Sequence, residues 1–122
     1  MVPVKGNTRW QNLFNHLKDK GFDVYSPGTK IGECKAAYVV ISHDGSSRHP
    51  TVSSDEDLYA VMCYVPKLQY SILEEMIQEI KAAMVELKPM FLPYGSQTPS
   101  FYDDSVKAHM ISIEYKNYKK IM

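Results

Sequence analysis

The sequence has little of what usually assigns a function directly. It contains only two cysteines among 122 residues, Cys34 and Cys63, and they do not form a CxxC pair. Two cysteines are too few for a disulfide framework, so we interpret both as reduced thiols of a cytosolic protein, with a single bridge as the alternative. No CxxC or HExxH ligand spacing occurs, and we expect neither a metal nor another cofactor.

An excess of charge is also missing. Lysine and arginine number 14, aspartate and glutamate number 14, and the formal net charge is zero. Binding to nucleic acid or to a membrane surface needs a basic excess, so we do not expect a dedicated binder of either. Because the chain is neutral, little like-charge repulsion opposes the association of its copies.

Long apolar runs are absent as well. No stretch approaches the roughly 18 consecutive apolar residues of a membrane span, and the first residues lack the apolar region of a secretory signal. Apolar residues nevertheless make up 44% of the chain and charged residues 23%, which is ordinary for a globular protein. We therefore expect one folded domain, residues 1–122, and no membrane partner.

Two amphipathic helices are predicted. The first spans Thr8–Lys20, because apolar residues recur there at helical spacing and Gly21 follows. The second spans Ile72–Lys88, and Ser71 with Glu74 matches a capping box at its start. The apolar stripe of the first helix is Trp10, Leu13, Phe14 and Leu17, and that of the second is Leu73, Met76, Ile77, Ile80, Met84 and Leu87.

Runs rich in β-forming residues predict the strands. Asp44–Ser47 has strong turn chemistry, and the polar residues Arg48–Asp55 extend it into a long hairpin tip. Met90–Lys107 is an aromatic connection that we expect to lie on the body of the protein. The predicted strands are a short one at Phe22–Tyr25 and longer ones at Ala36–His43, Glu56–Val65 and Ala108–Tyr115. The fold class is α+β, with a mainly antiparallel four-stranded sheet and two amphipathic helices in the order α-β-β-β-α-β.

The two central strands are apolar on both faces, but two helices can cover only one face of a sheet. The other face carries Tyr38 and Val40, together with either Tyr59, Val61 and Cys63 or the residues that alternate with them. The connection after the second helix shields part of this face, and we infer that another copy of the chain shields the rest. The candidate subunit contacts are Tyr38, Val40, Tyr59 and Val61.

An alternative function of another class is that of a small hydrolase or nuclease, and two polar clusters contain side chains that such an enzyme would use. One contains His43, Asp44 and His49, and the other is Asp103 with Asp104. Neighbours in sequence rarely form a catalytic triad, and no nucleophile elbow or phosphate-binding loop is present. We interpret the clusters as a solvated hairpin tip and as acidic element boundaries, and we do not expect an enzyme. A monomeric ligand-binding domain with a definite pocket is a further alternative.

The order of segments resembles a known family. The chain runs through WQNLFNHL, DVYSPGTK, AAYVVIS, EDLYAVMCYVP, SILEEMIQEIKAAMVEL and HMISIEYK. In this order they resemble the tail-terminator, or tail-completion, proteins of long-tailed bacteriophages and their prophage relatives. The resemblance covers nearly the whole chain and rests on element order and pattern.

The resemblance implies a structural protein of the virion tail, present in the bacterial cytoplasm during assembly. Such proteins form a ring, typically a hexamer, at the head-proximal end of the tail tube, where they end tail growth and join the tail to the head. The partners would be further copies of the chain, the tail-tube protein and the head connector, and DNA would pass through without specific binding. Another small head–tail connector or a minor capsid protein is the alternative. Contacts with neighbouring rings would come from the hairpin residues Ser46, Ser47, Arg48 and His49 and from the basic end Lys116, Lys119 and Lys120.

Overall fold

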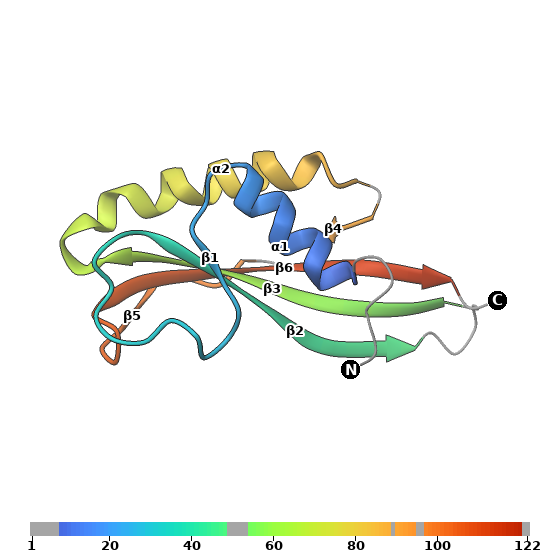
Figure 1. Ribbon diagram of the computed structural model, residues 1–122, viewed down its shortest axis with the longest axis horizontal. Coiled ribbons are helices and arrows are strands. Elements are labelled where there is room, and N and C mark those ends of the chain that lie inside the picture. Colours follow the sequence, from blue (N-terminus) through green and yellow to red (C-terminus); the bar gives the residue numbers. More distant parts are fainter. Residues whose placement is uncertain (1–7, 49–53, 89, 95–96, 121–122) are drawn as a thin grey trace, which may run out of the picture.

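The protein is α+β, as the sequence predicted. The computed structural model describes residues 8–48, 54–88, 90–94 and 97–120, and for residues 45–48, 54–56 and 118–120 it describes the backbone alone. Figure 1 shows two helices on one side of a single twisted sheet. In chain order the elements are α1 (Arg9–Asp19), β1 (Val24–Tyr25), β2 (Tyr38–Arg48), β3 (Ser54–Pro66), the 3-10 helix η1 (Lys67–Ile72), α2 (Leu73–Val85), β4 (Leu92–Pro93), β5 (Phe101–Asp103) and β6 (Ala108–Lys120).

The sheet is larger and more mixed than predicted. It has six strands in the order β1-β2-β3-β6-β4, and β5 also pairs with β6. β1 runs parallel to β2, whereas the other pairs are antiparallel. The additional strands β4 and β5 come from the predicted connection Met90–Lys107. This connection follows the edge of β6, where Tyr94 N donates to Glu114 O and Thr98 N to Ser112 O, both at 3.0 Å. It therefore blunts a sheet edge, which would otherwise expose unpaired backbone groups.

The central hairpin is longer than predicted, and this corrects two expectations. Asp44–Ser47 is not a turn, because β2 continues through it to Arg48 after a bulge between His43 and Gly45. A bulge admits one extra residue while the ladder goes on, so turn-type residues can remain within a strand. The basic end is likewise no separate tail. Lys116, Lys119 and Lys120 belong to β6 and pair in register with Leu58, Asp55 and Ser54 of β3.

The start of the second helix differs from the prediction, whereas the first helix begins as expected. Thr8 and Gln11 form a capping box at α1: Gln11 N donates to Thr8 Oγ1 at 3.1 Å, and Thr8 N donates to Gln11 Oε1 at 2.8 Å. The capping box expected at Ser71 is absent. η1 runs into α2 there, so Ser71 lies inside a helical turn. The N-cap residue of α2 is Ile72, and no side-chain hydrogen bond caps this helix start. The first helix matches the prediction Thr8–Lys20 closely, since Thr8 and Lys20 are its two caps.

The helices bury one face of the sheet. α1 contacts β1 and β2, and α2 contacts β3 and β6. Trp10 Nε1 donates to Ile41 O at 3.0 Å, which fixes α1 to β2, and His16 Nε2 lies 2.8 Å from Ala83 O, which joins the two helices. The fully buried side chains of this core include Leu13, Leu17, Val39, Ile41, Val61, Val65, Leu73, Ile77, Ile80, Met84 and Phe91.

The other face, which we call the far face, is partly covered by the chain itself. Cys34, Tyr38, Val40 and Ala108 form a second, smaller buried cluster. The loop at residues 26–37 closes over it, with Cys34 N donating to Val106 O at 2.7 Å. Because these apolar residues are already buried, the expectation that a second copy must cover them is wrong for this part of the sheet. Register places Ser42, Ser112 and Glu114 on the remainder of the face, beside the half-buried Leu58 and Met62.

Candidate functional site

The four predicted contact residues do not lie together. Tyr38 and Val40 lie in the cluster of the far face, whereas Tyr59 and Val61 lie in the core beneath the helices. All four are buried within the chain. The sequence had left open which residues of β3 share a face with Tyr38 and Val40. The structure selects the alternates of Tyr59 and Val61, which are Leu58, Ala60, Met62 and Tyr64.

The first predicted polar cluster does not converge on one point. His43 lies against the ring of Tyr59, with ring centroids 4.9 Å apart, and its Nε2 is 3.6 Å from Asp57 Oδ1. Asp44 instead accepts a hydrogen bond from Ser42 Oγ at 2.8 Å. The bulge after His43 separates the two residues, so their side chains have different partners. His49 lies outside the described residues.

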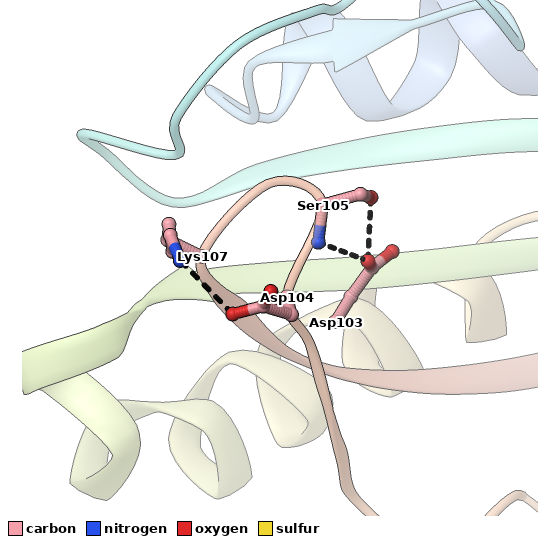
Figure 2. A network of polar contacts seen from close by, with 4 residues as sticks. All are labelled: Asp103, Asp104, Ser105 and Lys107. Atoms are coloured by element: carbon pink, nitrogen blue, oxygen red, sulfur yellow. Dashed lines mark hydrogen bonds and ion pairs between the residues drawn. The ribbon is translucent and has the colours of Figure 1, made fainter.

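The second predicted cluster forms a turn (Figure 2). Asp103 Oδ1 accepts hydrogen bonds from Ser105 N at 3.0 Å and from Ser105 Oγ at 2.6 Å. Asp104 Oδ1 pairs with Lys107 Nζ at 2.9 Å, and this hydrogen bond is the main cause of the raised pKa of Lys107. Lys107 has a φ of 53°, the left-handed conformation that a tight turn requires. The two carboxylates therefore stabilise the connection between β5 and β6.

The two predicted polar clusters also lie far apart along the sheet, with Asp103 and Asp104 at one end and His43 near the middle of its strand pairing. Asp103 pairs in register with Ala108, whereas His43 pairs with Tyr59, which pairs with Tyr115. Ala108 and Tyr115 are on the order of 24 Å apart along β6, at about 3.4 Å per residue. Among the residues that the structure describes, no three His, Cys, Asp or Glu side chains gather as metal ligands would.

The clearest unexplained surface is an apolar one at one end of the molecule. Its residues come from η1 and from β5, two elements that lie at the same end of the sheet in Figure 1. Leu68 is 93% exposed, and Tyr70 and Phe101 are about half exposed. We call Leu68, Tyr70, Phe101 and Tyr102 the end surface.

Two rings of the end surface, those of Tyr70 and Tyr102, pack on His109. His109 lies between Tyr70 and Tyr102, with ring centroids 4.7 Å and 5.2 Å away and edge-to-face geometry on both sides. His109 Nε2 is 3.1 Å from Lys67 O, and Tyr70 Oη is 2.8 Å from Ser100 Oγ. Aromatic side chains fixed before binding lose little conformational entropy when a partner covers them. The geometry therefore suits contact with another protein.

Sequence reasoning placed this surface outside any regular element. Residues 67–70 followed a predicted strand, and residues 101 and 102 lay in the predicted connection. They meet only because β5 pairs with the start of β6, where Phe101 lies opposite Met110 and Tyr102 opposite His109. The available signals were the aromatic content of the connection and the excess of tyrosine, which suggested contact surfaces without locating one.

A narrow groove lies along α2 on the side of β4. Its volume is about 270 Å³, and the buried side chains of Met84, Phe91 and Tyr115 form its floor. Lys81 and Glu114 lie on its rim. Burial raises the pKa of Tyr115 to about 12, so the phenol stays protonated well above the pH at which an exposed tyrosine ionises. The groove thus offers a mostly apolar lining to whatever enters it.

No protein-family model and no curated protein matches this chain. A functional interpretation therefore depends on the residues and the geometry described above. None of the helices in the described ranges is long and apolar enough to cross a membrane. The end surface collects exposed apolar side chains from η1 and β5, and strand alternation puts Phe101 and Tyr102 on opposite faces of the sheet.

Proposed function

We propose that this protein is a structural component of a bacteriophage or prophage tail. Copies of the chain form a ring at the head-proximal end of the tail tube, end tail growth and join the tail to the head. The observation that carries the self-assembly is the end surface, whose apolar side chains are exposed in the single chain. The place of the ring in the virion follows from the resemblance to tail-terminator proteins.

The energetics favour association through the end surface. Burying one leucine or aromatic side chain contributes roughly 1.5–3 kcal/mol, and Tyr70, Phe101 and Tyr102 are of the kinds that dominate contact energies. A stable contact buries on the order of 800 Å² per partner. The zero net charge of the chain leaves little long-range repulsion between copies.

A ring needs two different contact surfaces on each subunit, repeated around a closed rotation. The end surface supplies one of them at the end of the sheet where Pro66 of β3 pairs with Ala108 of β6. The opposite end is formed where Ser54 pairs with Lys120, next to Ser46, Ser47 and Arg48 of β2. In our proposal this second end, with Lys116 and Lys119, contacts the tail-tube protein or the head connector.

The experiment is to purify the whole chain, measure particle mass by native mass spectrometry and image the particles by negative-stain electron microscopy. We expect rings of one subunit number that bind a single end of purified tail tubes from the same phage or prophage. Rings that bind the head connector and not the tube would identify a head-closure protein instead. A chain that remains monomeric at all concentrations and binds no tube end contradicts the proposal.

A further inference from the structure

A hollow with an acidic rim lies between the end of α1 and the first half of α2. Its volume is about 350 Å³. No lysine or arginine lines it within the described residues, although the chain as a whole is neutral. The floor is apolar and consists of Phe22, Ala37 and Met76, while the rim carries Asp23, Glu75 and Glu79.

The charges of this acidic hollow oppose one another. Glu75 and Glu79 are four residues apart on α2, where like charges destabilise a helix by a few tenths of a kcal/mol. Asp23 accepts a hydrogen bond from Tyr25 Oη at 3.0 Å, which gives it a donor but no positive charge. Lys20, just after α1, is paired with Glu86 at 2.7 Å. Within the described residues, the lining of the hollow thus carries three carboxylates and no lysine or arginine.

A protruding residue with basic neighbours lies on η1, the element whose last residue, Ile72, lines the hollow. Leu68 is nearly fully exposed and follows the exposed Lys67 in η1. A shallow depression beside Leu68 is lined by Lys35, Lys67 and Lys107, against the single carboxylate of Glu33. Lys107 forms an ion pair with Asp104. The other two lysines that line the depression, Lys35 and Lys67, have no such ion pair among the described residues.

We propose that Leu68 of one copy enters the acidic hollow of the next copy. Its apolar side chain meets Phe22 and Met76, and its companions Lys67 and Lys35 meet Glu75 and Glu79. Both the polarity and the sign of charge are complementary, and one subunit uses two different surfaces, as a ring requires. This inference rests on the proposed function and names the second contact surface that the ring needs.

Charge reversal tests the contact without touching the core, because all four rim and companion residues are exposed. The first variant carries Glu75→Lys and Glu79→Lys, and the second carries Lys35→Glu and Lys67→Glu. We expect each to raise the dissociation constant of the assembly about tenfold or more, since like charges then meet across the contact. A variant with all four changes is expected to regain assembly, because reversed charges meet reversed charges.

Two further samples separate this contact from a general effect of net charge. Mixing the two double variants should restore assembly in particles where the variants alternate, because unaltered surfaces meet at one contact and reversed surfaces meet at the next. A variant with Glu75→Lys, Glu79→Lys, Lys18→Glu and Lys88→Glu is again neutral but has no complementary surface, so we expect it to stay dissociated. Glu74→Lys alone, on α2 but outside the hollow, should change little.

The possible failures are distinguishable by native mass spectrometry. If the wild-type chain forms rings and both double variants form them equally well, this contact is overturned while the proposed function stands. If the fourfold reversed variant fails to reassemble although circular dichroism shows it folded, the pairing of the two surfaces is overturned as well. A wild-type chain without any assembly contradicts both proposals.

Discussion

The two faces of the sheet are covered in different ways. α1 and α2 cover one face with side chains that recur at helical spacing, and a continuous core results. In the described part of the chain no helix packs on the far face, and the loop that carries Cys34 covers one end of it, where Tyr38 and Val40 are buried. Four of the large apolar residues that are exposed in the described ranges belong to the end surface, while Ile31, Val85, Met90 and Tyr94 come from other segments.

The largest loss of stability should follow from a substitution that opens a cavity beneath the helices. Ile80→Ala removes a fully buried side chain of α2, and we expect it to lower the free energy of unfolding by about 2–5 kcal/mol. Urea unfolding followed by circular dichroism measures this loss. Val85→Ala is the matched control on the same helix, because Val85 is exposed and should cost less than about 0.5 kcal/mol.

The same measurement on the far face should give a smaller loss. Tyr38 stacks on Tyr64 with ring centroids 4.8 Å apart, meets Tyr25 edge-to-face at 5.8 Å, and has Lys30 Nζ 5.6 Å from its ring centre. Tyr38→Leu keeps the apolar bulk and removes these ring contacts, so we expect a loss of about 1–2 kcal/mol. A loss as large as that of Ile80→Ala would show that packing on the far face stabilises the fold as much as packing on the helix-covered face.

A third prediction concerns the start of each helix that covers the core. Thr8→Ala removes the capping box of α1 and should cost about 1 kcal/mol. Ser71→Ala, at the position where the sequence suggested a capping box, should cost less than about 0.5 kcal/mol, because Ser71 caps nothing in the structure. Equal costs for the two substitutions, measured by thermal unfolding, would contradict the assignment of the caps.

A fourth prediction concerns stability at alkaline pH. Burial raises the pKa of Tyr38 and Tyr115 from 10.0 to about 12, and that of the Cys63 thiol from 9.0 to about 12. The unfolded chain therefore loses these protons before the folded chain does. Stability should be fully present below pH 9 and fall as the pH rises through the interval up to about 12.

Single substitutions show how much of this alkaline loss of stability comes from each face of the sheet. Tyr38→Phe removes the titrating group of the far face, and Tyr115→Phe removes one on the helix-covered face. Each should make the decline between about pH 9 and 12 less steep, as measured by urea unfolding at several pH values. An unchanged slope in both variants would show that other groups govern the alkaline loss.

The helix-covered face was predictable because its pattern is periodic. Leu13 and Leu17, or Ile77, Ile80 and Met84, indicate both a helix and the side of it that is buried. The alternation in β2 likewise separated Val39 and Ile41 from Tyr38 and Val40. Which set of β3 residues joins which face was not predictable, because both sets are apolar and the choice depends on register.

The far face and the end surface depend on long-range contacts that have no local pattern. Cys34 is buried because its backbone pairs with Val106, more than seventy residues away in the chain. The strand pairing of Tyr102 with His109, and the packing of Tyr70 on His109, are likewise invisible before the fold is known. The bulge after His43 carried the ladder through Asp44–Ser47, where composition indicated a turn.

The most direct measurement is the mass of the assembly for variants of the end surface, by analytical ultracentrifugation of the whole chain. Leu68→Ser with Phe101→Ser alters two exposed residues and should leave folding intact while reducing the assembly to single chains. Ile31→Ser with Val85→Ser alters two equally exposed apolar residues elsewhere and should leave the mass unchanged. Equal masses for both variants, or loss of assembly only in the second, would contradict self-assembly through the end surface.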